Sequence, residues 1–448
     1  MRIAAALAGA SALAIALAAC APGSGGAKPA STAGGEISTD VAAAGDITLT
    51  VWDQEVRGGQ DEQMKRLNEE FQKKYPNVTI NRVSQAFDDL NKTLRLALTG
   101  EDAPDVVQSN NGRNVMGAFV KAGQLRPLDD YAGLYGWKDR FAPSVLQYSS
   151  YSEDAKTFGS GSVYGLPQTG EVVGVFYSKK ALATAGITLP STWKDFESAL
   201  ATAKSAGAAP LVLGNIDKWP AIHVFGPVQG SAVPADTIAK LGMGNAGADW
   251  TSAESVKAAE TLQGWATKGY FNDGPNGTDY DAAWQSFGSG QGMFLIGGSW
   301  LGADLQDAMG DDVGFFVPSR EDGTSATTGG TGLPFAITSA ARNTDVAAAY
   351  IDFITSDEAM KILAETGNMP VNGTAALAPA RGVQADIFSA FGMVTGEGDL
   401  LPYLDYATPT FSDTLGDALQ GLIDGKLTPQ QFTEALQADY SGFVSSNG

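Results

Sequence analysis

From residue 46 onward, apolar residues recur either every second position or every third to fourth position. Residues 46–52 (DITLTVW) alternate strictly and predict a first strand. Residues 60–75 place Met64, Leu67 and Phe71 on one face, which predicts a helix that ends before Pro76. A strand over 78–83, a leucine-lined helix over 90–98 and a strand at 105–107 follow. This alternation indicates βαβ units and a mainly parallel sheet.

The same periodicities extend through the rest of the chain. They predict strands over 210–213 and 313–318, and a strand, a glycine-rich turn and a helix start within 290–300. They also predict helices over 193–206 and 345–365, one that carries Val256 to Trp265, and a C-terminal pair that begins at 408–409 and at 428–431. Thr192 with Asp195 and Thr428 with Gln431 have the spacing of capping boxes. Thr251 and Ser299 are further candidate caps, and residues 215–225, which contain Pro220, are expected to form a loop.

One stretch, residues 162–179 (SVYGLPQTGEVVGVFYSK), organises this pattern. Gly165 and Pro167 break any helix, and the following β-branched and aromatic run predicts a buried strand. Gln168 and Glu171 lie in this apolar setting, so their polar groups must be paired, hydrated or available to a ligand. Taken alone, the stretch favours an ordinary strand that carries one exposed glutamate. Residues 329–338 have a similar glycine-rich and then apolar pattern.

Charge and rare residues exclude several function classes. The chain has 448 residues and a formal net charge of −21, which argues against nucleic acid as a partner. A single histidine, His223, leaves little room for histidine metal sites or catalytic triads, so neither a metal nor a cofactor is expected. Cys20 is the only cysteine, and the folded part can therefore form no disulfide.

The N-terminal segment predicts export. Arg2 precedes an apolar run over 3–19 that is too short for a stable membrane span, and the run ends in LAAC at Cys20. This ending resembles the lipobox of bacterial lipoproteins. It implies a signal peptide over 1–19, lipidation of Cys20 and a flexible tether over 20–45. The alternative is a plain secretory signal followed by an incidental cysteine.

Several short motifs, in order, resemble a known family. They are the VW ending of the first strand, GxxxPDVV at 100–107, YGLP and YSK within 162–179, AGIxLPxTW at 185–193, GQGMFLIGGSW at 290–300 and GNMPVN at 367–372. Together they resemble the family 1 sugar-binding proteins of bacterial ABC importers, which are similar to maltose-binding protein, from about residue 46 to 442. Ser178 stands where the family usually has asparagine, and the segment around Gln291 and Phe294 matches the family's G-x-AM-x-x-x-G-x-W pattern imperfectly.

The resemblance implies an α/β, two-lobed periplasmic-binding-protein fold of type II. Each lobe would hold a mixed, mainly parallel sheet flanked by helices, with a cleft between the lobes. Residues 46–168 and 332–370 would form the N-lobe, and residues 169–331 and 371–448 the C-lobe. The implied protein is a monomer that closes on a carbohydrate, delivers it to the transmembrane subunits of an ABC permease and contacts the membrane only through its lipid.

The resemblance and the ends of the predicted strands also suggest which side chains hold the ligand. Aromatic rings would stack on sugar rings, and amides and carboxylates would bind the hydroxyls. The expected ligand-binding residues are Trp52, Asp53, Gln54, Asn110, Asn111, Gln168, Glu171, Trp219, Gly298, Trp300, Gly330 and Tyr406. Arg113, His223 and Tyr403 are either cleft residues or structural ones. The aromatic group around Tyr403 and Phe411 is equally consistent with packing between helices, and Asn110–Gly112 with a simple turn.

Two other function classes remain as alternatives. A secreted glycoside hydrolase would need paired carboxylates, but the adjacent pairs at 88–89, 129–130 and 311–312 point apart on a helix or strand. No GxSxG elbow or nucleotide-binding glycine spacing occurs, and no catalytic residue is assigned. A structural surface lipoprotein would need neither the crossing segments nor aromatic residues in a cleft.

Overall fold

The computed structural model describes residues 37–100, 102–207 and 209–447. The predicted signal peptide and Cys20 lie outside these residues. The last part of the predicted tether packs against the fold. Val41 is buried among the core residues of the first sheet, and the Asn77 side-chain amide donates to the carbonyl oxygens of Val41 and Gly45, both at 2.8 Å. An apolar side chain at this position therefore fixes the segment to the fold.

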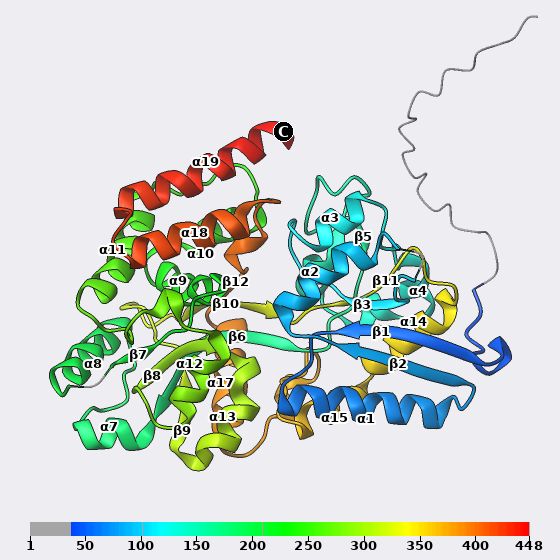
Figure 1. Cartoon of the computed structure of the whole chain (residues 1–448), viewed down its shortest axis with the longest axis horizontal. Coiled ribbons are helices and arrows are strands. Elements are labelled where there is room, and N and C mark those ends of the chain that lie inside the picture. The colour runs from blue at the N-terminus through cyan, green and yellow to red at the C-terminus, as the bar shows by residue number, and fades with distance from the viewer. Residues whose placement is uncertain (1–36, 101, 208, 448) are drawn as a thin grey trace, which may run out of the picture. The chain divides into compact units, whose positions relative to one another are not determined.

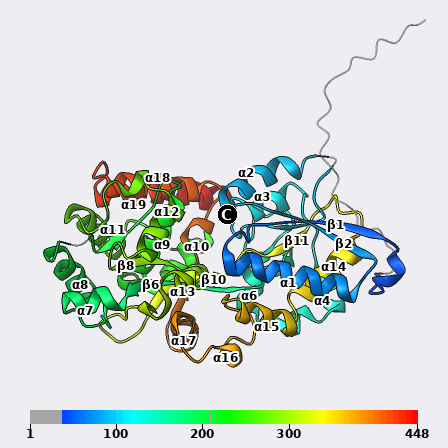
Figure 2. The same cartoon turned by 60° about the horizontal axis from the view of Figure 1, so that its bottom comes forward.

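The first sheet has four strands in the order β11-β3-β1-β2. Their bounds are β1 Ile47–Asp53, β2 Val78–Ser84, β3 Val106–Gln108 and β11 Phe335–Ile337. β1 runs parallel to β2 and β3, while β11 returns antiparallel to β3. In Figures 1 and 2 the first sheet is surrounded by the helices of the N-terminal part of the chain and by α14 and α15. These helices are α1 Gly58–Lys74, α2 Phe87–Ala97, α3 Met116–Lys121, α4 Asp129–Leu134, α5 Trp137–Arg140, α6 Pro143–Leu146, α14 Thr344–Ile354 and α15 Asp357–Glu365.

The apolar face of α1 builds much of the first core. Met64, Leu67 and Phe71 are buried, as their helical spacing predicts. The Phe71 ring meets Tyr350 of α14 edge-on, with ring centroids 5.3 Å apart. The helix predicted over 345–365 is two helices, because Ser356 ends the first and caps α15 by accepting from the backbone N–H of Ala359.

The second sheet has the order β12-β10-β6-β8-β7, and β9 also pairs with β6. Its strands are β6 Gly170–Ser178, β7 Leu211–Val212, β8 Phe294–Gly298, β9 Val313–Phe316, β10 Ala326–Thr331 and β12 Asp399–Leu401. The sheet is mixed, but the expectation that it is mainly parallel is wrong. β6 pairs antiparallel with β8, β9 and β10 because it arrives from the first sheet while these three strands run back toward it.

Helices cover both faces of the second sheet (Figure 1). They are α7 Lys179–Ala185, α8 Trp193–Ser205, α9 Trp219–Ala232, α10 Ala235–Met243, α11 Ala253–Thr267, α12 Tyr280–Gly288, α13 Gly302–Met309, α17 Val383–Gly396, α18 Phe411–Ile423 and α19 Pro429–Asn447. The remaining short elements are η1 Ala42–Ala44, η2 Gln147–Ser149, β4 Ser150–Tyr151, β5 Ser162–Val163, η3 Pro275–Gly277, η4 Ser299–Leu301, η5 Gly310–Asp312, α16 Thr374–Leu377 and η6 Leu404–Tyr406.

The predicted helix caps have mixed outcomes. The capping box of Thr192 and Asp195 is present, and Thr428 exchanges hydrogen bonds with Gln431 at the start of α19. The cap of α11 is Ser252 and not Thr251, because the Ser252 hydroxyl accepts from the backbone N–H of Ser255. Ser299 caps no helix, since its hydroxyl accepts instead from the backbone N–H of Val172 in β6.

The loop expected over 215–225 is wrong, because α9 begins at Trp219. Pro220 lies in its first turn, where the backbone needs no N–H donor, so this proline starts the helix and does not break one. This helix start determines how two candidate site residues are placed. Trp219 and His223, four residues apart, lie on the same face of one helix.

The three segments that link the sheets lie side by side. The backbone N–H of Gly170 donates to the carbonyl oxygen of Met369, and the backbone N–H of Val371 donates to the backbone carbonyl oxygen of Gln168. The N–H of Gly332 donates to the carbonyl of Thr169. These segments therefore form one hydrogen-bonded strip between the two sheets. None of the helices in the described ranges is both long and apolar enough to span a bilayer.

Candidate ligand-binding site

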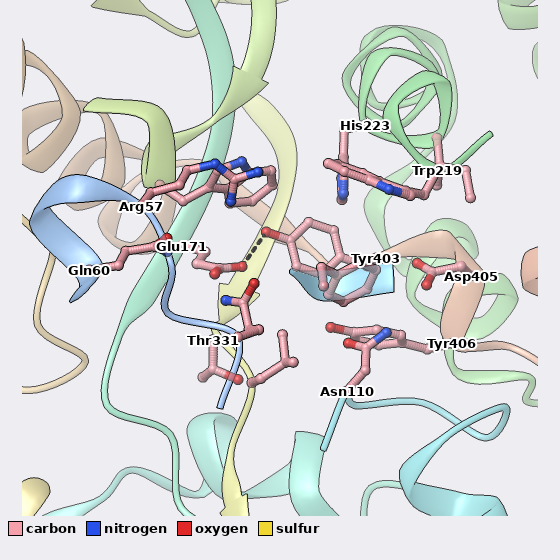
Figure 3. Close-up of a pocket in the computed structure, with 15 residues that line it drawn as sticks. Arg57, Gln60, Asn110, Glu171, Trp219, His223, Thr331, Tyr403, Asp405 and Tyr406 are labelled. Atoms are coloured by element: carbon pink, nitrogen blue, oxygen red, sulfur yellow. Dashed lines mark hydrogen bonds between the residues drawn. The ribbon is translucent and has the colours of Figure 1, made fainter. Parts of the chain in front are cut away.

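A cavity lies where the two sheets face each other, and side chains from both line it (Figure 3). The empty space within it amounts to about 690 Å³, a figure that includes the open solvent at its mouth. The lining residues near the first sheet are Gln54, Arg57, Gln60, Phe87, Asn110 and Leu333, and Thr331 lies at the end of β10 in the second sheet. Those near the second sheet are Glu171, Trp219, Ile222, His223, Trp300, Tyr403, Asp405 and Tyr406.

Strand ends deliver the polar groups of the first sheet. Gln54 follows the carboxyl end of β1, and Asn110 follows that of β3. Parallel strands end at the same sheet edge, so the two loops meet there. The backbone N–H of Gln54 donates to the side-chain carbonyl of Gln108 at 2.8 Å, which fixes the first loop to the second.

Glu171 occupies the second position of β6 and faces the cavity (Figure 3). Its Oε2 accepts a hydrogen bond of 3.0 Å from the Tyr403 hydroxyl. Burial raises the pKa of the Glu171 carboxyl to about 7, and the negative charge of Glu55 adds to this effect. Burial likewise raises the pKa of Glu55 to about 7, although its carboxylate accepts from Gln108 at 2.7 Å. The site thus holds a carboxyl that changes charge near neutral pH.

Aromatic rings form a continuous wall opposite the first sheet. The ring centroid of His223 lies 5.6 Å from Trp219, 5.1 Å from Trp300 and 5.0 Å from Tyr403. Tyr403 in turn meets Tyr406 at 5.7 Å. This wall offers flat apolar faces to a ligand ring. Because burial lowers the pKa of His223 to about 3, its imidazole is neutral and adds no positive charge.

The position of the Trp300 ring explains one glycine. A Cβ atom at Gly298 would lie 2.0 Å from Cζ3 of Trp300, so only glycine lets this indole fold back over the strand. The indole N–H donates to the Tyr280 hydroxyl at 2.8 Å, which fixes the ring. The role that the structure supports for Gly298 is to accommodate Trp300.

The cavity lining carries more acidic than basic side chains. The Arg57 guanidinium pairs with Asp281 of α12 at 3.0 Å and lies over the Tyr280 ring at 5.6 Å. Asp405 has no ion-pair partner among the described residues, and burial raises the pKa of its carboxyl to about 6. The lining is therefore acidic overall.

Two lining residues present buried polar atoms that have no hydrogen-bond partner in the described part of the chain. They are Oε1 of Gln60 and Oγ1 of Thr331. The side chains of both residues are more than nine-tenths buried. Buried polar atoms in native proteins are almost always paired with protein, water or ligand, so these acceptors mark places where a bound molecule can donate.

Six of the predicted ligand-binding residues line the cavity: Gln54, Asn110, Glu171, Trp219, Trp300 and Tyr406. The other six do not line it. Trp52 is half-buried against the core, and Gly330 pairs with Glu171 in the sheet. Asn111 donates to the Tyr148 carbonyl at 2.8 Å, and Gln168 is buried between Gln63 and the Ile354 carbonyl.

Asp53 is also held inside the fold. It is fully buried and accepts from Arg82 through both carboxylate oxygens, at 2.6 and 2.8 Å. Arg113 is structural as well, since its guanidinium donates to the carbonyl oxygens of Ala155, Lys156 and Met243. Asp53 is the last residue of β1 and Arg113 follows β3, but their partners turn the charged groups into the fold.

The aromatic group around Tyr403 divides between site and core. Tyr403 and Tyr406 line the cavity, whereas Phe411 is buried and stacks on Trp250. Sequence reasoning missed Asp405, although it lies between the two tyrosines. It also missed Arg57 and Gln60 at the start of α1, because charged and amide residues at a helix start usually serve the helix itself.

The described residues show no metal-binding arrangement. They contain no group of three or more His, Cys, Asp or Glu side chains that could hold a metal ion. The one histidine contacts aromatic rings, and its buried Nδ1 has no partner in the described part. What the arrangement can do is hold a ring between aromatic faces and bind its polar edge.

Comparison with known proteins bears on this site. The family model for bacterial extracellular solute-binding proteins matches residues 58–361. The Multiple sugar-binding protein of Streptococcus mutans serotype c is 23% identical over 319 residues, which make up 69% of this chain and 72% of that protein. An uncharacterized ABC transporter extracellular-binding protein of Pyrococcus horikoshii is 31% identical over 178 residues, or 38% of this chain and 37% of that protein.

A solved structure of a chitin oligosaccharide binding protein is also similar. It superposes with a TM-score of 0.76 at 23% identity, covering 89% of this chain and 99% of that one. At this identity the likeness concerns the fold alone. It confirms the two-lobed α/β periplasmic-binding-protein architecture with mixed sheets.

Proposed function

The chain belongs to the bacterial extracellular solute-binding protein family, and we propose that it captures a carbohydrate, most suitably an oligosaccharide, for an ABC import system. Family membership makes it a binding protein and not an enzyme, which removes the glycoside hydrolase alternative. The proposed ligand site is the cavity between the two sheets, and the proposed partner is the transmembrane permease.

The observation that carries the proposal is the combination of Glu171 with the aromatic wall. Aromatic faces bury the apolar C–H surface of a sugar ring while its hydroxyls stay at the edge. Glu171, Asn110 and Gln54 lie at that edge and accept or donate to hydroxyls. Sugar binding by the Streptococcus mutans relative and oligosaccharide binding by the structural relative support the same ligand class.

We propose that capture involves closure of two lobes, with residues 46–168 and 332–370 in one and 169–331 and 371–448 in the other. Contacts across the cavity support this mechanism. Arg57 beside α1 pairs with Asp281 of α12, and the Trp219 indole donates to Asp88 of α2 at 3.4 Å. The strip of three linking segments would act as the hinge. Small-angle scattering should show a smaller radius with saturating ligand, and an unchanged radius would count against closure.

Lipidation of Cys20 is part of the same proposal. The lipobox-like LAAC sequence and the absence of any other cysteine in the chain support it. Cys20→Ser should release the protein into the medium or leave it unprocessed. Cleavage and membrane attachment as in the wild type would contradict lipidation.

A thermal-shift screen tests the ligand class. Ligand present at 100 times its Kd adds about 2.7 kcal/mol to the free energy of unfolding, so a sugar panel should yield clear upward shifts for its ligands. Amino acids and short peptides serve as the comparison panel. Stabilisation by a member of that panel and by no sugar would assign the protein to another solute class.

A further inference from the structure

Two carboxyl groups face the cavity without a cationic partner in the described part of the chain. They are Glu171 of β6 and Asp405 of η6. In the view of Figure 3 they lie on opposite sides of the Tyr403 ring. The Tyr403 hydroxyl donates to Glu171, but no side chain of the described residues donates to Asp405.

The one cation in the cavity lining does not balance these charges. Arg57 is bound to Asp281 at 3.0 Å, and its guanidinium stacks near Tyr280. His223 is neutral because its ring is surrounded by other aromatic rings. Bringing two carboxylates into a closed cavity with no counter-charge is costly. A ligand that carries positive charge removes this cost.

The uncharged part of the lining also suits a cation. Trp219, Trp300 and Tyr403 present π-faces, which attract an ammonium group held within about 6 Å. Oε1 of Gln60 and Oγ1 of Thr331 are buried acceptors that lack partners in the described residues. An ammonium group carries three donors and no acceptor, so it matches a lining rich in unfilled acceptors.

We infer that the ligand is an amine-bearing saccharide whose protonated amino group pairs with Asp405, the lining carboxyl that has neither a cationic partner nor a side-chain donor in the described part of the chain. This inference rests on the proposed function, since it takes a sugar as the ligand. The sugar ring would stack on the aromatic wall, while the amine would supply the positive charge that the cavity lacks. The high net negative charge of the chain, −21, would also favour the encounter with a cation.

Matched sugar pairs test the inference. Purified full-length protein is titrated calorimetrically at neutral pH with glucosamine, galactosamine and mannosamine, each against its parent hexose. The β-1,4-linked glucosamine disaccharide is titrated against cellobiose and against its N-acetylated form, which keeps the ring but loses the charge. The amine-bearing member of at least one pair should bind at least about tenfold tighter, a difference of about 1.4 kcal/mol.

Variants assign the preference to the cavity. Asp405→Asn should reduce the amine preference several-fold, whereas Asp413→Asn, which removes the same charge from the exposed face of α18, should leave it unchanged. Equal or tighter binding of the neutral member in every pair overturns the inference while leaving the proposed function standing. If no sugar of either kind binds, both fail. An equal loss of preference in the two variants also overturns the inference, because it would reflect net charge alone.

Discussion

The Tyr403 hydroxyl donates a hydrogen bond of 3.0 Å to Oε2 of Glu171, across 232 positions of sequence. This bond joins the residue before η6, near the C-terminal helices, to the start of the strand that crosses between the sheets. It orients the carboxyl while leaving its second oxygen available. The pair is therefore the centre of the proposed site, and its properties lead to the first prediction.

Glu171→Ala should weaken sugar binding at least tenfold without unfolding the protein. Hydrogen bonds to a charged group contribute about 1.5–3 kcal/mol, and each 1.4 kcal/mol is tenfold in affinity. Calorimetric titration with the sugar that gives the largest thermal shift measures the loss. Tyr403→Phe should produce a smaller loss, since it removes only the orienting donor. Wild-type affinity in a folded Glu171→Ala variant would place the ligand elsewhere.

Trp300→Ala should weaken binding by at least as much, because it removes an aromatic face from the wall. Trp300→Phe keeps a flat ring and should retain most of the affinity. Tryptophan fluorescence and calorimetry give independent values for the dissociation constant. Equal affinities for the alanine and phenylalanine variants would show that stacking at this position contributes nothing.

Glu171 should also make stability depend on pH. Burial raises its pKa to about 7 from about 4.5, so the folded state holds a proton that the unfolded state has released in this range. The free energy of unfolding should fall as pH rises from about 4.5 to about 7. In ligand-free protein, the melting temperature of Glu171→Gln relative to wild type should therefore rise across this window. Glu55 titrates in the same direction, so the comparison is between variant and wild type.

Substitution of Asp53, which is buried and pairs with Arg82, should lower the stability of the protein and leave its sugar affinity nearly unchanged. Asp53→Ala removes the buried carboxylate that pairs with the half-buried Arg82, which keeps Asp61 and the Glu55 carbonyl as partners, and it should lower the free energy of unfolding by about 1–3 kcal/mol. Glu70→Ala breaks the exposed pair with Lys73 and should cost less than about 1 kcal/mol. Urea unfolding measures both. Sugar affinity of folded Asp53→Ala should stay within about twofold of wild type, and a large loss would return Asp53 to the site.

The sequence was sufficient for the parts of the fold that depend on local periodicity. The strand of residues 170–178 and the amphipathic helix α1 follow directly from apolar spacing. Periodicity failed where one residue type is compatible with two different local structures. Pro220 can break or start a helix, and only its tertiary context, with most of α9 buried, selects the second.

Whether a polar side chain lines the cavity depends on its hydrogen-bond and ion-pair partners, which lie far away in the sequence. Asp53 ends β1 and Gln54 directly follows it, yet Arg82 binds the first and the second lines the cavity. Asp405 was missed because a lone aspartate between two tyrosines carries no local signal of burial. Long-range pairing of this kind is not visible in a single sequence.

A crystal structure of the protein with the sugar that produces the largest thermal shift is the most direct test of the proposed site. We expect a pyranose ring packed against Trp300 or Trp219, with a polar group of the sugar at hydrogen-bond distance from Glu171. Density for the sugar outside this cavity, or a ring that contacts neither tryptophan nor Glu171, would contradict the account.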